Sequence, residues 1–238
     1  MIILQKKRLG FIASVLLVAV FVFTFQKANL ENTIPTVTLP VSNKIVVLDA
    51  GHGSPDEGAQ SSNGTTEAQI NLQIAFKVQN LLEQSGATVV LTRSDENAIY
   101  DANSSTIREK KVSDIHNRVK IGNESSADIF VSIHLNKIPQ QQYWGWQCFY
   151  NSRNENSKIL AQTIQQNLNE AIQNENKREA LKLDTIYLMK NVEIPISVVE
   201  CGFLSNPEEE QQLQNDEYQD KLAWGIYTGI MDYFQENI

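Results

Sequence analysis

Cysteine, histidine and proline are scarce in this chain of 238 residues, which holds two Cys, three His and six Pro. The two cysteines, Cys148 and Cys201, are too few to form a cysteine metal cluster. They could form a disulfide in an oxidising exterior or remain two buried thiols, because each lies in an apolar, strand-like run. Repeats and low-complexity tracts are also lacking, so we predict no second module that binds a polymer.

Positive charge is in short supply as well. The chain carries 20 Lys and Arg against 28 Asp and Glu, a formal net charge of -8. Because binding to nucleic acid depends on phosphate contacts from basic side chains, we expect no nucleic-acid partner. The acidity itself identifies no substrate, since a soluble protein surface can have the same composition.

Only one long apolar run is present, the uncharged segment from Leu9 to Phe25, which follows three consecutive cations. This pattern predicts an N-terminal membrane anchor or signal over residues 1–25, with its basic end in the cytoplasm. The segment after it lacks the small residues of a cleavage site, so we favour a membrane-anchored protein over a secreted one. A linker over residues 26–43 and one exported domain over residues 44–238 complete the predicted organisation.

The exported domain alternates strand and helix patterns, which predicts an α/β fold with a largely parallel sheet between helices. The run Ile45–Leu48 is apolar and β-branched, as in a strand covered on both faces. Further buried strands are predicted at Thr88–Thr92, Asp128–Leu135 and Ile194–Gly202, and helices near Asn156–Ile172 and Glu217–Gln235.

Three helix starts have a recognisable sequence signal. Thr66-x-x-Gln69 and Thr106-x-x-Glu109 have the pattern of a capping box. Asn206 followed by Pro207 predicts an N-cap and a first helical residue, and the acids Glu208–Glu210 then lie in the first turn, where they favour the helix dipole.

His52, His134 and Glu200 each fall at the carboxyl end of a predicted parallel strand, the edge where open α/β sheets build their sites. Glu67, in the first turn of the following helix, can point back at this edge. Two imidazoles and one carboxylate with an open fourth position are the ligand set of a catalytic zinc site. The ligands are widely separated in sequence, so their spacing alone does not establish a metal.

A zinc ion held by His52, Glu67 and His134 would polarise a carbonyl and lower the pKa of a bound water toward ~7, which suits hydrolysis of an amide. Such a reaction needs a group that moves the proton to the departing nitrogen. Glu200, at the end of an apolar strand, is the candidate for this role. The alternative is that Glu200 forms an ion pair with an Arg or Lys.

Four ordered motifs resemble the zinc-dependent N-acetylmuramoyl-L-alanine amidases of the Amidase_3 family, and the resemblance covers nearly everything from Lys44 onward. It departs from the common pattern at Leu135 and over 136–139, which concerns the shape of the local pocket. The motifs are Lys44–Gly53 with Asp-Ala-Gly-His-Gly, Gly64–Glu67, Ala127–Asn136 with Ser-Ile-His-Leu, and Pro195–Asn206 with Glu-Cys-Gly-Phe-Leu-Ser-Asn.

The resemblance implies a single domain around a six-stranded sheet, one zinc ion held by His52, Glu67 and His134, and Glu200 as the catalytic glutamate. The implied reaction hydrolyses the amide between the lactyl group of N-acetylmuramic acid and L-alanine in peptidoglycan. An anchor, a linker and a bare catalytic domain are similar to the layout of germination-specific members, which act in forming muramic-δ-lactam in spore cortex. Some members need an activating protein partner.

Two alternatives remain at this stage, a zinc peptidase acting on peptidoglycan peptides and a non-catalytic wall-binding protein. Other polar or aromatic residues have structural interpretations. His116 lies in a polar helix and is expected at the surface, and Trp144 and Trp146 are expected in the core unless they stack on substrate. Arg93 could bind a substrate carboxylate, but neutralising a buried acid is the favoured role.

Overall fold

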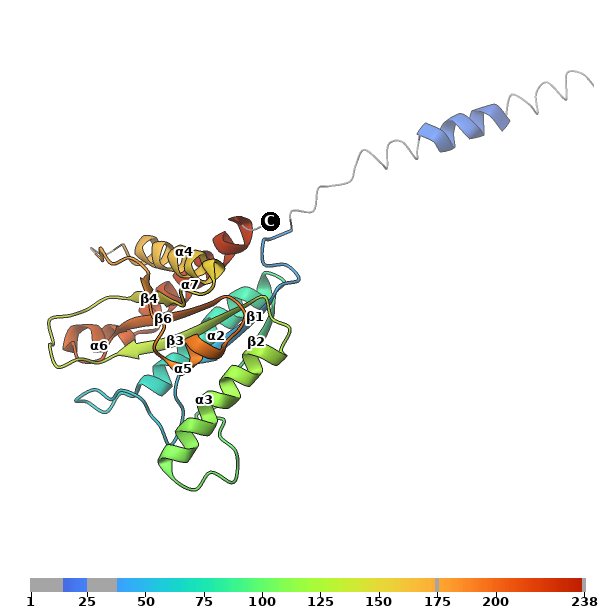
Figure 1. The fold of residues 1–238 in the computed structure, drawn as a ribbon. Coiled ribbons are helices and arrows are strands. Elements are labelled where there is room, and N and C mark those ends of the chain that lie inside the picture. Colours follow the sequence, from blue (N-terminus) through green and yellow to red (C-terminus); the bar gives the residue numbers. More distant parts are fainter. Residues whose placement is uncertain (1–14, 25–37, 174–175, 237–238) are drawn as a thin grey trace, which may run out of the picture. The chain divides into compact units, whose positions relative to one another are not determined.

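The computed structural model describes residues 15–24, 38–173 and 176–236, and the chain divides into two units, residues 1–38 and residues 39–238 (Figure 1). In the first unit, residues 15–24 form a helix with exposed apolar side chains. Within the described ranges, no helix is both long enough and apolar enough to cross a membrane. Residues 1–14 and 25–37, which hold most of the predicted anchor and linker, lie outside the described residues.

The second unit is built on a six-stranded sheet with the order β2-β1-β3-β6-β4-β5. Every pair of neighbours is parallel except β4 and β6, which are antiparallel. The predicted α/β domain with a mostly parallel six-stranded sheet is therefore confirmed. The strands are β1 (Ile45–Ala50), β2 (Thr88–Leu91), β3 (Ile129–Asn136), β4 (Gln147–Tyr150), β5 (Leu181–Lys182) and β6 (Ile196–Phe203).

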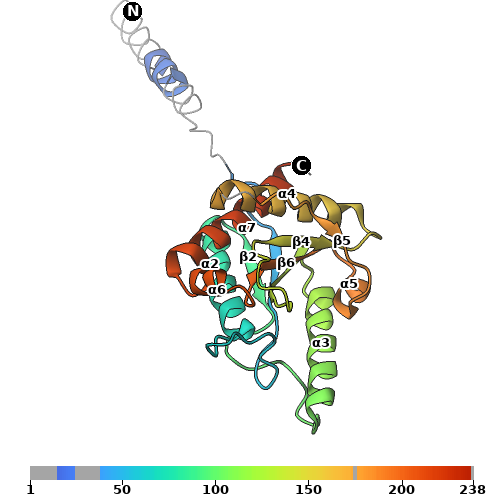
Figure 2. The ribbon, with the colours of Figure 1, turned by 90° about the vertical axis from the view of Figure 1, so that its left-hand side faces the viewer.

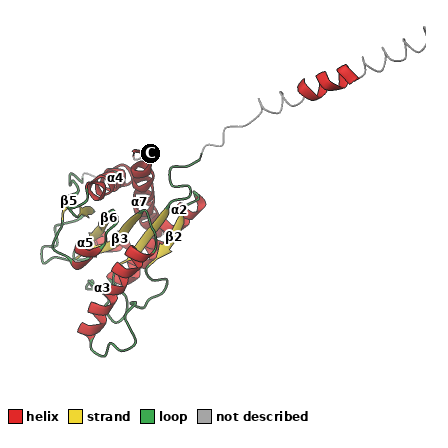
Figure 3. Cartoon of the chain, turned by 45° about the vertical axis from the view of Figure 1, so that its right-hand side comes forward, coloured by secondary structure: helices red, strands yellow, loops and turns green. Residues whose placement is uncertain are grey.

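Helices cover both faces of this sheet, and in Figure 3 the strands lie between them. α2, α4 and α7 lie on one face, and α3 and α5 lie on the other (Figure 2). α6 follows β6 directly and contacts both β6 and α7. The helices are α2 (Glu67–Gln84), α3 (Ile107–Glu124), α4 (Glu155–Ile172), α5 (Tyr187–Asn191), α6 (Pro207–Leu213) and α7 (Asp216–Glu236).

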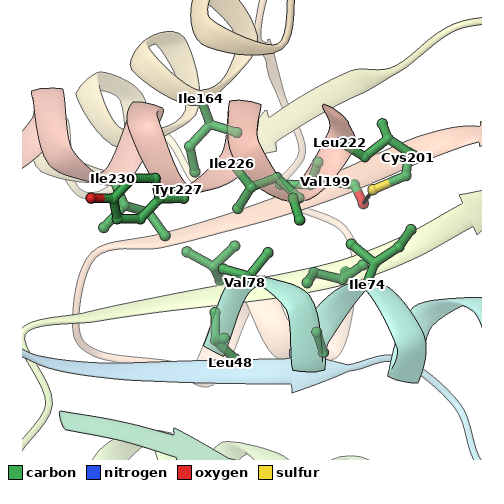
Figure 4. Close-up of a cluster of buried hydrophobic side chains, with 14 of the residues drawn as sticks. Leu48, Ile74, Val78, Ile164, Val199, Cys201, Leu222, Ile226, Tyr227 and Ile230 are labelled. Atoms are coloured by element: carbon green, nitrogen blue, oxygen red, sulfur yellow. Dashed lines mark hydrogen bonds between the residues drawn. The ribbon is translucent and has the colours of Figure 1, made fainter. Parts of the chain in front are cut away.

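The larger hydrophobic core lies between the sheet and the three helices α2, α4 and α7 (Figure 4). Leu48 of β1, Ile74 of α2 and Ile226 of α7 are fully buried in it. Each such side chain contributes roughly 1.5–3 kcal/mol by leaving water. α4 and α7 approach closely because Gly229 has no side chain, since a Cβ there would lie 2.5 Å from the Cα of Ile164.

Of the three helix caps predicted from the sequence, those of α3 and α6 are present and that of α2 is not. Thr106 and Glu109 form the predicted capping box, and Asn206 caps α6. The Thr66 side chain makes no cap hydrogen bond, so the capping box predicted there is wrong. Backbone carbonyls of the preceding loop take its place, because Glu67 N–H donates to the carbonyl of Ala59 at 2.8 Å.

The structure also shows how deeply β2 and the two cysteines are buried. β2, predicted as a strand covered on both faces, lies at the edge of the sheet and is partly exposed, because β1 is its only partner among the described strands. Cys148 and Cys201 are both free and fully buried, so the two-thiol alternative holds in this structure. Burial raises the pKa of both thiols.

Candidate metal centre

The carboxyl edge of the sheet brings together three of the four predicted site residues. His52 follows β1, His134 lies near the end of β3, and Glu67 begins α2. One ligand atom from each of them lies within 4.8 Å of the others, a group that could hold a metal ion. The two histidines lie close together as predicted, because β1 and β3 are parallel neighbours whose carboxyl ends lie at the same edge of the sheet.

Glu67 lies between the two imidazoles. Its Oε1 is 3.3 Å from Nε2 of His52 and 3.0 Å from Nδ1 of His134. Backbone N–H groups fix the same carboxylate, because Leu135 donates to Oε1 at 3.1 Å and Ala59 donates to Oε2 at 2.8 Å. Burial alone would raise the pKa of Glu67, yet its bonds to the two histidines hold that pKa well below its usual value. An ionised carboxylate between two imidazoles fits a zinc ion.

His52 is held by a carboxylate that sequence reasoning missed. Its backbone is left-handed, with φ 63°, and its Nδ1 lies 3.2 Å from Oδ2 of Asp56. Lys111 of α3 in turn contacts Oδ1 of Asp56 at 2.8 Å. Burial lowers the pKa of His52, but Asp56 and Glu67 together raise it to about 9. A carboxylate on the second ring nitrogen commonly orients a metal-binding histidine, so an acid four residues after His52 was a usable signal.

Two glycines leave room for these side chains. A Cβ on Gly51 would lie 2.3 Å from Cε1 of His134. A Cβ on Gly58 would lie 2.5 Å from Oε2 of Glu67, and the φ of +69° at this position also favours glycine. The glycines around His52 therefore permit the close approach of backbone and site side chains.

Arg93 is a buried residue whose hydrogen bonds within the described ranges all go to backbone carbonyls. Its guanidinium is buried and donates to backbone carbonyls, at 2.8 Å to Ala50, 3.1 Å to Gly51 and 2.7 Å to Ala68. These bonds hold the chain just before His52, and no ion pair between Arg93 and an acid is formed among the described residues. In this part of the chain Arg93 therefore forms no direct ion pair with a buried acid, although the charges of Asp49 and Asp114 act on it and favour its charged form.

The partner of the buried acid is Arg118 of α3. It contacts Asp49 at 2.5 Å and Asp114 at 2.7 Å, and all three residues are buried. Its second terminal nitrogen donates to the carbonyl of His52 at 2.6 Å. Arg118 therefore links the buried acids to the loop that carries His52. Its spacing from Asp114 is a local pattern, but its contacts with Asp49 and with the His52 carbonyl are long-range and no local pattern predicts them.

Glu200 lies beside the three-residue group. It is the register partner of His134 in the neighbouring strand, so the two side chains are on the same face of the sheet. Burial raises the pKa of Glu200, and its Oε2 has no hydrogen-bond partner among the described residues. The alternative interpretation as an ion-pair partner has no support in this part of the chain, because no Arg or Lys bridge to Glu200 is formed.

The remaining candidates lie in structural positions. His116 is exposed and contacts the Tyr187 ring, with ring centroids 4.8 Å apart, as expected of a surface histidine. Trp146 is fully buried and its indole N–H donates to Asn169 at 2.7 Å, so it belongs to the core. Trp144 is partly buried.

Two imidazoles and a carboxylate at the carboxyl edge of a largely parallel α/β sheet are the arrangement expected of a metal-dependent hydrolase. Residues 46–232 match the family model of N-acetylmuramoyl-L-alanine amidases. The chain belongs to this family.

One curated relative matches along almost the whole chain, and two solved structures match along 82% and 83% of it. The germination-specific N-acetylmuramoyl-L-alanine amidase of Bacillus subtilis is 38% identical over 234 residues, 98% of each chain. The structure of the CwlD amidase from Clostridioides difficile, solved in complex with the GerS lipoprotein, has a TM-score of 0.79 and 43% identity, covering 82% of this chain and 100% of that one. An N-acetylmuramoyl-L-alanine amidase from Clostridium difficile 630 has a TM-score of 0.72 and 32% identity, covering 83% and 100%.

These findings establish the enzyme class. The protein is a zinc-dependent N-acetylmuramoyl-L-alanine amidase that acts on peptidoglycan, and the group of His52, Glu67 and His134 is consistent with one zinc ion. Because its substrate is the cell wall, the enzyme works outside the cytoplasm.

Proposed function

We propose that His52, Glu67 and His134 hold the zinc ion and that Glu200 moves the proton during the reaction. The bond cleaved is the amide between the lactyl group of N-acetylmuramic acid and L-alanine of the stem peptide. The observation that carries this assignment is the meeting of three ligand atoms within 4.8 Å beside a buried carboxylate with an unpartnered oxygen.

In the proposed reaction, residues of the chain transfer the proton and hold the metal ligands in position. When bound, zinc supplies a Lewis acid for the carbonyl and lowers the pKa of water toward ~7. Glu200 has a free oxygen on the same face as His134, so its carboxylate can accept a proton and pass it to the departing nitrogen. Asp56 and Arg118 hold His52 in place, and two backbone N–H groups hold Glu67.

Zinc stoichiometry and activity together test the ligand assignment. We expect the purified protein to bind one zinc ion, and chelation to stop the release of stem peptides until zinc is restored. His134→Ala should weaken zinc binding by more than the roughly 100-fold that loss of an outer-shell partner can produce. His116→Ala is the matched control, since this third histidine is exposed. Normal zinc affinity in His134→Ala would show that the ligand set is wrong.

The similarity to the germination-specific amidase over 98% of both chains supports a role in spore cortex. There, removing the stem peptide bares the muramic acid for conversion to muramic-δ-lactam. Cortex from a strain that lacks this protein should then contain no muramic-δ-lactam, and an unchanged content would exclude the role.

The exposed apolar side chains of residues 15–24 support a membrane anchor at the N-terminus, on the outer side of the cytoplasmic membrane. Separation of membrane and soluble fractions tests this proposal. Recovery of the whole protein in the soluble fraction, at full length, would contradict it.

A protein partner that raises activity is part of the proposal, supported by the relative that was solved as a complex with a lipoprotein. We expect the purified full chain to turn over peptidoglycan slowly by itself and its kcat to rise when the partner is added. Full turnover by the purified chain alone would exclude this dependence.

A further inference from the structure

The first turn of α6 holds three consecutive glutamates that differ in their surroundings. Glu208 is exposed, whereas Glu209 and Glu210 are only 4% and 2% exposed. A favourable interaction with the helix dipole does not require burial, so it explains Glu208 and leaves the two buried carboxylates unexplained. Their hydrogen bonds lead to two different segments beside the metal centre.

Glu209 joins the end of β6 to the segment that leads into β4. Its Oε2 accepts a hydrogen bond from the N–H of Phe203 at 2.8 Å, and its Oε1 accepts one from the N–H of Gly145 at 2.7 Å. Phe203 follows Glu200 by three residues in β6, and Gln147, two residues after Gly145, is the register partner of Glu200. Glu209 therefore fixes both strands around Glu200.

Burial makes this position costly for a carboxylate. It raises the pKa of Glu209 to about 7, against the lowering effect of the two N–H groups and of Arg178. The side chain also packs against the backbone, because a Cβ on Gly202 would lie 2.9 Å from Oε1. An apolar side chain would avoid this cost but could not accept the two hydrogen bonds.

Glu210 reaches the loop that leads into α2. Its Oε2 accepts a hydrogen bond from Nδ2 of Asn63 at 2.9 Å, and its Oε1 accepts one from the hydroxyl of Thr65 at 3.0 Å. These two residues belong to the loop that ends where α2 begins with Glu67. The same loop supplies the Ala59 N–H that donates to the Glu67 carboxylate.

We infer that Glu209 and Glu210 are positioning residues, which together tether the strand of Glu200 and the loop of Glu67 to one rigid turn. The inference rests on the proposed roles of Glu67 and Glu200. α6 thereby sets the distance between the metal ligands and the proton-moving carboxylate. Glu209 holds the strands around Glu200 and Glu210 holds the loop before Glu67, so substitutions at the two positions should have different effects.

The test compares Glu209→Gln and Glu210→Gln in the zinc-loaded full chain, with the exposed Glu208→Gln as the matched control. We expect Glu210→Gln to weaken zinc binding by roughly 3- to 10-fold, less than the loss for a direct partner of a metal ligand, because Glu210 contacts the loop before Glu67 and not Glu67 itself. We expect Glu209→Gln to keep its zinc affinity within about twofold and its KM, and to lose about 10-fold in kcat, since misplacing a catalytic group lowers the rate.

Zinc affinity needs no substrate, so it reports on the Glu210 tether even where the assigned reaction is wrong. Thr65→Val keeps the buried carboxylate and removes one of its bonds, and it should weaken zinc binding in the same direction if Glu210→Gln fails to fold. Gly202→Ala displaces the Glu209 carboxylate and should lower kcat in the same way. Variants that only lower the melting temperature, with unchanged zinc affinity and kcat, would overturn the inference.

Discussion

Replacing Glu200 with Gln is expected to lower kcat by about 10²–10⁴-fold, the range that general acid–base catalysis contributes. The amide has nearly the shape of the carboxylate but cannot carry the proton from water to the leaving nitrogen. Zinc affinity should stay within about twofold, because no hydrogen bond or ion pair among the described residues joins Glu200 to His52, Glu67 or His134.

Single-turnover release of stem peptides, normalised to bound zinc, measures this effect. Glu193→Gln is the matched control, because Glu193 is exposed just before β6 and its change should leave kcat unaltered. Release at the wild-type rate by Glu200→Gln would mean that another group moves the proton.

Replacing Arg118 with Met should lower the free energy of unfolding by about 3–5 kcal/mol, the cost of leaving a buried charge without its partner. The methionine fills a similar volume but leaves Asp49 with the hydroxyls of Ser132 and Thr92 as its only hydrogen-bond donors among the described residues. The His52 carbonyl also loses its donor, so zinc affinity should fall together with stability.

Urea unfolding of the zinc-free protein separates the two effects, because stabilisation by the metal is then absent. Arg108→Met on the exposed side of α3 is the control and should change the free energy of unfolding by less than about 0.5 kcal/mol. A loss below about 1 kcal/mol for Arg118→Met would show that the buried acids need no cation.

Much of the fold and the convergence of His52, Glu67 and His134 could be predicted from the sequence because the signals were local. Apolar, β-branched runs mark β1, β3 and β6, and parallel strands place their carboxyl ends at one edge. His52 and His134 follow from that rule without knowledge of any long-range contact. The resemblance to the family then implied a sheet of six strands, without placing β5 (Leu181–Lys182) in the sequence.

Asp56 lies only four residues from His52 and could have been found in this way, but the contacts of Arg118 with Asp49 and of Glu210 with Asn63 could not, because these partners lie far apart in the sequence. Arg118 reaches Asp49 across 69 positions, and Glu210 reaches Asn63 across 147. The spacing of apolar residues along a strand or helix gives no information about contacts between residues so far apart in the sequence. The capping box at Thr66 failed for a related reason, since the loop before α2 folds back and supplies its own carbonyls.

The mass of the fragment released from peptidoglycan tests the central claim most directly. We predict intact stem peptides with a free amino group on L-alanine, and glycan strands whose muramic acid carries a free lactyl carboxylate. Their appearance should depend on bound zinc. Peptides cut between amino acids would identify a zinc peptidase instead, and binding to the wall without any fragment would identify a non-catalytic wall-binding protein.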